Sequence, residues 1–178
     1  QDAAKYEAPF EFVKKRVKRD RIKNARKVYR ERWWIHGEPR PDMRAALAGL
    51  KRYIATARVT KHRIFAWVGD GVLCDSATFV FARSDDYFFG VLHSRAHEVW
   101  ARATGTQLRE AESGFRYTPT TCFETFPFPR ATKDQQRAIW LAAKELDQLR
   151  TRWLNPEGMI GAKELAKRTL TELYNKRP

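Results

Sequence analysis

The residues best suited to chemistry lie in a short polar segment that is bounded by Gly105 and Gly114. In the major groove of DNA, arginine pairs with guanine, glutamine with adenine, and glutamate with the amino group of cytosine. All three side-chain types occur in this segment. Glutamates would repel a phosphate backbone, so their presence beside arginine favours the reading of base edges over plain electrostatic attraction. The candidate base-reading residues are Gln107, Arg109, Glu110, Glu112 and Ser113.

A strand is expected directly after this segment. Residues 115–126 are rich in Thr, Phe and Tyr, which suit a half-buried strand. Pro127 and Pro129 end it, because proline lacks the N–H that a strand ladder requires. A polar loop beside a rigid strand is a place where contacts vary without loss of the fold. An alternative stays open, in which the glutamates form ion pairs with Arg109 and Arg116 and read no base.

The most basic part of the chain spans residues 9–35, with eleven lysines and arginines against three acidic residues. Apolar residues recur there at helical spacing, which predicts one or two helices with a broad basic face. The chain as a whole carries a net charge of +14, so nucleic acid is the leading partner class, ahead of an anionic membrane surface. We expect Lys14, Lys15 and Lys18 to contact DNA phosphates. The alternative is a charged face that only keeps the helix soluble.

Trp33 and Trp34 follow the basic block and precede a break at residues 37–41. Paired tryptophans can stack on nucleic-acid bases. Large aromatic side chains also anchor helices on a core, and we favour this second interpretation. Pro41 and Gly49 are expected to start and stop a short helix.

A small, mostly antiparallel sheet is expected within residues 51–82. Three strand-like runs, at residues 53–59, 64–68 and 77–82, are separated by turn sequences. The connection between the first two runs is strongly basic, and it forms a candidate DNA-facing edge. Loop charge that serves only solubility is the alternative. The residues of this edge are Arg58, Lys61, His62 and Arg63.

Apolar residues at three- and four-residue spacing predict a helix over residues 87–104, capped by Asp85 and Asp86. His93 and His97 would share one face of this helix, as helical zinc ligands do. No third ligand accompanies them, so a surface or packing pair is favoured over a metal site. Arg95 and His97 are candidates for phosphate contact.

Two further helices are expected at residues 134–154 and 162–175, separated by a proline and glycine break. They are predicted to form a helical hairpin, packed on the sheet or on another part of a larger enzyme. The predicted apolar seam of the first helix is Ile139, Ala142, Leu146, Leu149 and Trp153.

The sequence lacks the signatures of catalysis. It contains no Gly-x-Ser-x-Gly motif, glycine-rich phosphate loop or dinucleotide fingerprint. Cys74 and Cys122 lie far apart and lack surroundings that would activate a thiol, so we expect both to be reduced. No apolar run approaches the length of a membrane span, and no signal-peptide pattern opens the chain. We therefore expect no metal, no cofactor, no membrane contact and no catalysis by this chain alone.

Several dense motifs, in order, resemble the C-terminal part of MmeI-like single-chain restriction–modification DNA methyltransferases of type IIG/IIL. The motifs are RWW at 32–34, YIAT at 53–56, YFFGVLHS at 87–94, FRYTPTTCFETFPFP at 115–129 and KRTLTELYN at 167–175. The resemblance implies a target recognition domain over residues 1–130 and a C-terminal helical domain over residues 131–178.

The resemblance also implies where specificity is determined. In similar proteins the segment before the Arg-Tyr-Thr motif varies with specificity, and Arg116, Tyr117 and Thr118 are expected at the DNA backbone or groove. The family often has a basic or polar side chain where Gly114 stands, so one contact is missing here or is supplied from elsewhere. The parent enzyme would use S-adenosylmethionine to methylate adenine at N6, and Mg²⁺ as well where it also cuts DNA. The motifs for both activities are absent from this chain.

These observations lead to one expected architecture and one expected function. We expect an α+β fold, in which a small antiparallel sheet packs with helices and a C-terminal helical hairpin follows. The chain would bind double-stranded DNA in the bacterial cytoplasm and present a base to the methyltransferase domain of the same parent chain. Two alternatives stay open: a sequence-independent nucleic-acid-binding module, and a helical protein-interaction domain.

Overall fold

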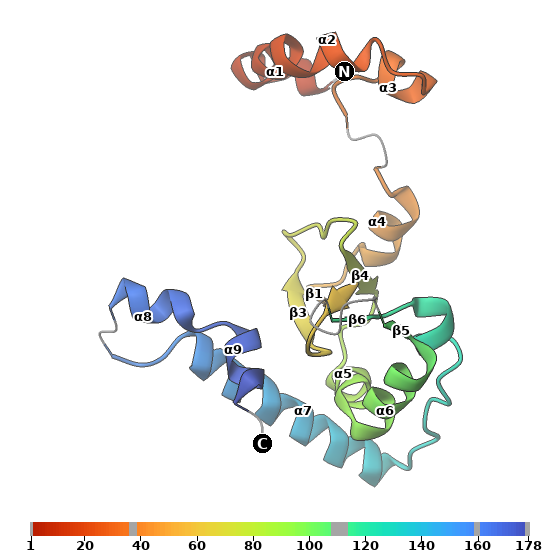
Figure 1. Cartoon of the computed structure of the whole chain (residues 1–178), viewed down its shortest axis with the longest axis vertical. Helices are drawn as coiled ribbons and strands as arrows, with labels where there is room; N and C mark the ends of the chain where they lie inside the picture. The colour runs from red at the N-terminus through yellow and green to blue at the C-terminus, as the bar shows by residue number, and fades with distance from the viewer. Residues whose placement is uncertain (1, 36–38, 108–113, 159–160, 177–178) are drawn as a thin grey trace. The chain divides into compact units, whose positions relative to one another are not determined.

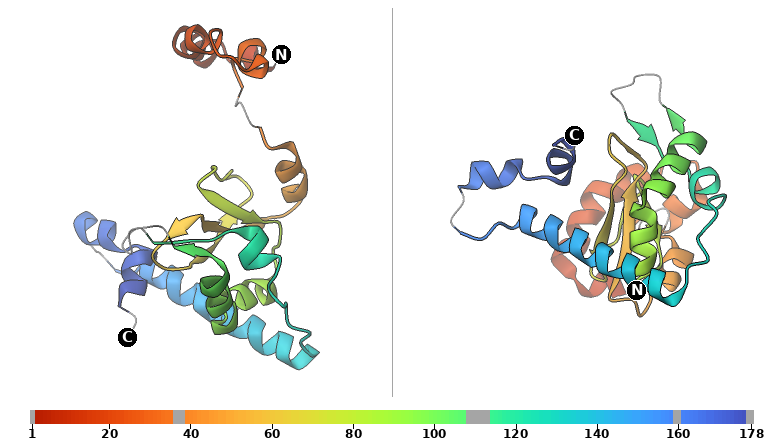
Figure 2. Two further views of the ribbon diagram at one scale, coloured as in Figure 1. Left: turned by 45° about the vertical axis from the view of Figure 1, so that its right-hand side comes forward. Right: turned by 90° about the horizontal axis from the view of Figure 1, so that it is seen from below.

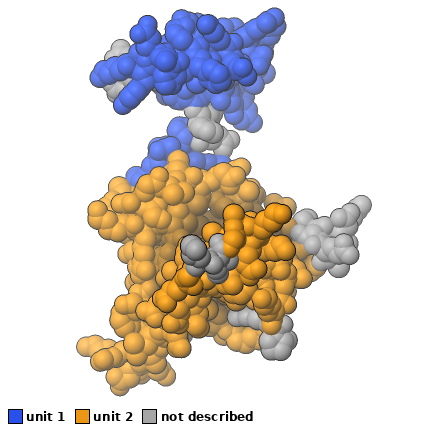
Figure 3. Space-filling model, turned by 90° about the vertical axis from the view of Figure 1, so that its left-hand side faces the viewer, with its two compact units in different colours: residues 1–46 blue, residues 47–178 orange. Residues whose placement is uncertain are grey.

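The computed structural model describes residues 2–35, 39–107, 114–158 and 161–176. The chain divides into two compact units, residues 1–46 and residues 47–178 (Figure 3). The expected boundary between residues 130 and 131 stays a prediction. Both units contain helices, and the strands lie in the second unit, so the α+β class is confirmed.

The first unit is built from short helical segments. A helical stretch runs through α1 (Glu7–Val13), the π-helical η2 (Lys14–Lys18) and α2 (Arg19–Arg21), and α3 covers Lys27–Glu31. The 3₁₀ segment η1 (Asp2–Lys5) precedes it, and α4 (Pro41–Leu47) spans the boundary between the two units in the sequence. Gly49 follows α4 at a φ of +82°, as the expected helix stop requires.

Trp33 is the buried centre of this unit. Its ring lies 5.5 Å from the ring of Phe10 and 5.6 Å from that of Trp34, centroid to centroid. Arg21 donates hydrogen bonds to the carbonyl oxygens of Trp33 and Ile35. Trp33 therefore packs against α1, and its burial leaves no face for stacking on a base.

Two antiparallel three-stranded sheets form the second unit, instead of the single sheet expected. The first has the order β3-β1-β4, and the second has the order β2-β6-β5. Their bounds are β1 Arg52–Ala57, β2 Val59–Thr60, β3 Phe65–Gly69, β4 Thr78–Phe81, β5 Thr106–Gln107 and β6 Phe115–Arg116. The run predicted as one strand at residues 53–59 thus supplies both sheets.

The predicted helix over residues 87–104 is in fact two helices, α5 (Asp86–His93) and α6 (Arg95–Thr104). Asp85 caps α5 as expected, because its side chain accepts a hydrogen bond from the N–H of Phe88. Ser94 has an extended backbone, with φ −64° and ψ 151°, and its hydroxyl caps α6 through the N–H of His97. A serine cap gives the chain an alternative to helix continuation, which apolar spacing alone does not reveal.

The predicted strand over residues 115–126 is wrong beyond Arg116. Residues Pro119–Phe123 form a π-helical segment, η4. Pro119 suits a first helical position, and the N–H of Cys122 bonds to the carbonyl of Thr118 at 2.7 Å. The buried Cys122 thiol lies 3.6 Å from the carbonyl oxygen of Ala101, so this turn packs on α6. Burial of Cys122 overrides the local preference of Thr and Phe for strands.

The long helix α7 (Lys133–Leu154) closes the core (Figure 1 and Figure 2). Thr132 and Gln135 form a capping box at its start. It packs on α5, where a Cβ on Gly90 would lie 2.7 Å from Ile139. The predicted seam is partly wrong, because Ala142 and Leu149 are exposed and the buried face follows Ala143 and Arg150. The apolar core joins the sheets to these helices, and its buried members are Ile54, Phe65, Phe81, Phe88, Phe89, Leu92, Ala101, Phe115, Tyr117, Cys122 and Ala143.

The last predicted helix is also divided, into α8 (Ala162–Lys167) and α9 (Leu170–Asn175). Thr169 caps α9 by accepting a hydrogen bond from the N–H of Glu172. α9 packs back on α7, as the expected helical hairpin requires. No helix among the described residues is both long enough and apolar enough to span a membrane.

His97 is fully buried, so the expected phosphate contact is wrong for this residue. Its Nδ1 lies 2.9 Å from the carbonyl oxygen of Leu92, which can only accept, so Nδ1 carries the proton. Its Nε2 then accepts from the hydroxyl of Tyr117 at 3.2 Å. His93 lies on the other helix, and the described residues contain no cluster of three or more metal-ligating side chains.

The buried His97 predicts an acid-sensitive fold. Burial lowers the pKa of His97 below its ordinary 6.5, whereas the unfolded chain keeps that value. Below pH 6.5 the unfolded state therefore binds more protons, and the free energy of unfolding falls by up to about 1.4 kcal/mol per pH unit until the folded pKa is reached. Urea titrations at pH 7.5, 6.5 and 5.5 measure this loss. His97→Gln should flatten the curve, and an unchanged slope in that variant would refute the assignment.

Candidate nucleic-acid interface

The predicted base-reading segment is held by a two-stranded stem. β5 and β6 pair antiparallel, with Thr106 opposite Arg116 and Gln107 opposite Phe115. β2 pairs with the other side of β6, through Val59 and Arg116. Gln107 is exposed at the end of β5, next to the candidate segment. The other candidate base-reading residues, Arg109, Glu110, Glu112 and Ser113, lie outside the described residues.

The two bounding glycines are required by close packing. A Cβ on Gly105 would lie 2.1 Å from the ring of Phe115. Gly114 has a φ of +84°, and a Cβ there would lie 2.6 Å from the backbone carbon of Thr60. A larger residue at position 114 would have to displace the backbone of β2. Glycine at this position is therefore a packing requirement of this chain.

Arg63 is buried, so its expected place at a DNA-facing edge is wrong. Its guanidinium donates to the hydroxyl of Thr56 at 3.1 Å, to the carbonyl of Ala57, and to the carbonyl of Phe115 at 3.0 Å. It also lies over the rings of Phe115 and Tyr117. Ala57 ends β1 and Phe115 begins β6, so one side chain ties the two sheets together. Burial lowers the pKa of Arg63 to about 10, which leaves it charged at neutral pH.

Three other residues of the predicted edge are accessible to different degrees. Lys61 is exposed, and His62 and Arg58 are half-buried. The side chain of Arg58 donates to the carbonyl of Ser76 at 2.9 Å and lies over the ring of Phe79. Lys61 and His62 both contact Asn175, at the end of α9. The structure therefore brings Lys61 and His62 together in one turn and turns Arg58 toward the β4 side.

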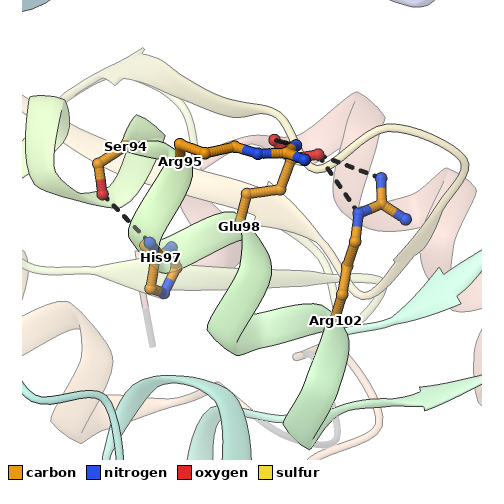
Figure 4. Close-up of polar contacts among 5 residues, drawn as sticks. All are labelled: Ser94, Arg95, His97, Glu98 and Arg102. Atoms are coloured by element: carbon orange, nitrogen blue, oxygen red, sulfur yellow. Dashed lines mark hydrogen bonds and ion pairs between the residues drawn. The ribbon is translucent and has the colours of Figure 1, made fainter.

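Arg95 lies on the exposed surface of α6 beside Glu98 (Figure 4). Glu98 lies between Arg95 and Arg102, at N–O distances of 3.4 Å and 3.2 Å. Such surface pairs contribute little to stability, because water and salt screen them. Arg95 has 82% of its side chain exposed, so it remains accessible to a phosphate.

The Arg-Tyr-Thr motif is only partly accessible. Arg116 is exposed on β6, and Thr118 is half-buried. Tyr117 is fully buried between His97 and Arg63, so its expected groove contact is wrong. Burial also raises the pKa of Tyr117 above its ordinary value. Tyr117 therefore supports the stem from inside while Arg116 faces outward.

The candidate phosphate-binding lysines of the first unit lie on its helical stretch. Lys14 is exposed and forms an ion pair with Glu11 at 2.8 Å. Lys15 is exposed, whereas Lys18 is half-buried, with its amino group 5.3 Å from the centre of the Trp33 ring. Lys14 and Lys15 are therefore the exposed members of the three.

Sequence reasoning missed two residues that shape this surface. Asn175 carries no signal of its own within the KRTLTELYN motif, and its contact with the basic turn spans more than 110 positions in the chain. Arg150 has the pattern of an ordinary cation on an amphipathic helix. It is buried, and it donates to the carbonyl of Phe65 at 2.8 Å. One signal was available in the sequence, because Arg150 lies among the apolar positions of the seam predicted for this helix.

Sequence comparisons with known proteins find a similar family and a similar relative. Residues 51–130 match the family described as "MmeI, target recognition domain". The chain is also 29% identical, over 107 residues, to "DNA methyltransferase A" of Bacillus subtilis (strain 168). That alignment covers 60% of this chain and 10% of the relative, so the chain spans about a tenth of that protein's length. No solved structure matches the chain significantly.

The matched segment contains both sheets, α5, α6 and the stem of the polar loop. The resemblance to MmeI-like proteins is therefore confirmed for residues 51–130. Residues 51–130 are therefore similar to target recognition domains, and this match covers less than half of the chain.

The packing around Gly114 predicts that its replacement damages the stem. Gly114→Ala combines an unfavourable positive φ with a collision against the backbone of Thr60, so we expect a loss of about 2–4 kcal/mol in the free energy of unfolding. Gly158→Ala is the matched control, because Gly158 has a φ of +99° and its added Cβ would meet no atom within 4 Å. Urea denaturation measures both. Equal losses would show that the collision has no effect.

Proposed function

We propose that this chain is the DNA-reading part of a larger adenine-N6 DNA methyltransferase of a restriction–modification system. The observation that carries the proposal is the match of residues 51–130 to a target recognition domain. The rigid stem beneath the polar segment supports it, because base readout requires side chains held by a firm scaffold. The relative's printed name supports a methyltransferase as the parent enzyme.

The proposed contacts divide into two classes. Exposed cations outside the polar segment, such as Lys15, Lys61 and Arg116, would contact phosphates and fix the position of the protein on the duplex. Gln107 and the polar segment after it would contact base edges in the major groove. Base readout would then depend on the segment, whereas salt sensitivity would depend on the cations.

The chemistry would be supplied by other parts of the parent protein. S-adenosylmethionine would bind to its methyltransferase domain, with Mg²⁺ in addition if the enzyme cuts DNA. This chain would contribute the positioning of a target adenine. The DNA substrate would place the enzyme in the bacterial cytoplasm, where it would serve in defence against phage.

A second candidate function is contact with protein by the first unit. Four of its apolar side chains are about half exposed or more, and burial of these side chains against a protein partner would remove them from water. They are Tyr6, Phe12, Ile22 and Val28, with exposures of 70%, 59%, 48% and 50%. The partner would be the remainder of the parent enzyme.

Selection from a randomised duplex library tests the base-reading proposal. The chain is mixed with the library at two salt concentrations, and the bound duplexes are sequenced. We expect one short motif to be enriched at both. Arg109→Ala should relax the preference at one position of that motif, at a cost of about 1–3 kcal/mol in binding free energy.

Arg137→Ala is the matched control, because Arg137 is an exposed arginine on α7, which contributes no strand to the stem. It should leave the motif unchanged. Salt-sensitive binding without enrichment would instead identify a sequence-independent module. Absence of DNA binding at both salt concentrations would refute the proposal and favour the protein-interaction function.

A further inference from the structure

The KRTLTELYN run at residues 167–175 is explained by neither the stem nor the polar segment. The structure places its second half in α9. Trp153 donates from its indole nitrogen to the carbonyl of Thr169 at 3.0 Å, which ties the start of α9 to the end of α7. The motif therefore fixes the C-terminal helix against the rest of the second unit.

The other end of α9 is anchored to the sheet. Tyr174 is buried, and its hydroxyl accepts a hydrogen bond from Arg150 of α7. The same guanidinium donates to the carbonyl of Phe65, the first residue of β3. The ring of Tyr174 also lies 6.0 Å from the ring of His62. α9 thus ends beside the turn that connects β2 with β3.

Asn175, the last residue of α9, contacts two of the polar residues of that turn, Lys61 and His62. Its Oδ1 accepts from the amino group of Lys61 at 2.9 Å and lies 2.8 Å from Nε2 of His62. An amide oxygen has two lone pairs, and these two groups use both. Its amide nitrogen donates to Glu172 at 3.3 Å, which fixes the orientation of the amide. Nε2 of His62 therefore carries a proton.

The neutral amide of Asn175 differs from a carboxylate in its effect on Lys61. A carboxylate in the same place would hold Lys61 but cancel its charge, whereas an amide orients the amino group and leaves the charge available. Lys61 remains exposed, and two of its three N–H groups remain for another acceptor. Holding a long side chain in place before binding reduces the ordering that association would otherwise require.

We propose that Asn175 is a positioning residue for DNA, which orients Lys61 and His62 toward a phosphate of the duplex backbone. The proposal rests on the proposed function, because it assigns a task to a residue outside the matched segment in the same DNA contact. It gives the C-terminal helices a part in DNA binding. The motif that ends at Asn175 then serves to bring this side chain into contact with Lys61, although the two residues lie 114 positions apart in the chain.

A double-mutant cycle on DNA affinity tests this proposal. The whole chain and its Lys61→Ala, Asn175→Ala and doubly substituted variants are titrated against a fluorescent duplex of mixed sequence, about 20 base pairs long, at several salt concentrations. Asn175→Ala should weaken binding roughly three- to tenfold, because Lys61 loses its fixed position. It should leave the salt dependence nearly unchanged, because no charge is lost. Lys61→Ala should reduce the salt slope by about one.

The two substitutions should be non-additive, so that Asn175→Ala has a smaller effect when Lys61 is already absent. Asn155→Ala is the matched control, because Asn155 also lies at the end of a helix, where its side chain donates to the carbonyl of Thr151 within α7. Thermal unfolding of each variant separates binding from stability. Normal DNA binding by a folded Asn175→Ala variant, or strictly additive losses, would overturn the positioning role alone. Absence of DNA binding by the unsubstituted chain would overturn the proposed function with it.

Discussion

The buried guanidinium of Arg63 is the interaction on which the second unit depends. The end of β1 and the start of β6 each present a carbonyl group to the interior, and Arg63 satisfies both. An arginine is suited to this task, because its planar group donates in several fixed directions at once. The described residues offer it no carboxylate partner. Its charge is stabilised by carbonyl and hydroxyl oxygens and by two aromatic rings.

This arrangement creates a stable base for the polar segment between Gly105 and Gly114. Phe115 is held by Arg63 and packs over Gly105, and Gly114 lies against the backbone of β2. The chain that enters and leaves the polar segment is therefore fixed on both sides. Residues between the glycines can then differ without a change in the core. Such a separation of scaffold and contact residues suits a domain whose task is to discriminate among sequences.

The elements with strong local signals could be predicted from the sequence. The cap at Asp85, the start and length of α7, and the strands around residues 53–57 and 65–68 follow from capping, periodicity and strand propensity. The break at Ser94 and the π-helical turn at residues 119–123 could not. A local serine cap decides the first, and the burial of Cys122 against α6 decides the second. Serine inside an apolar period is compatible with either outcome, and the burial of Cys122 has no local signature.

The residues of the candidate site also divide into those that the sequence predicts and those that it does not. Lysines and arginines are normally read as surface residues, and this holds for Lys15 and Arg116. It fails for Arg63 and Arg150, whose partners are backbone carbonyls in other elements. A backbone carbonyl partner does not show in the sequence as an acidic residue would. In the sequence, a buried arginine of this kind therefore looks the same as an arginine on a basic surface. The burial of Tyr117 escapes prediction for a related reason, because its partner His97 comes from a separate helix.

The role of Arg63 is tested most directly by native-state hydrogen–deuterium exchange of Arg63→Met, which keeps the bulk of the side chain and removes its donors. The account predicts faster exchange at residues 104–107 and 114–118, because β5 and β6 lose their attachment to β1. Protection of β1, β3 and α7 should remain. Unchanged exchange at residues 104–107 and 114–118, in a folded variant, would contradict the claim that Arg63 holds the stem in place.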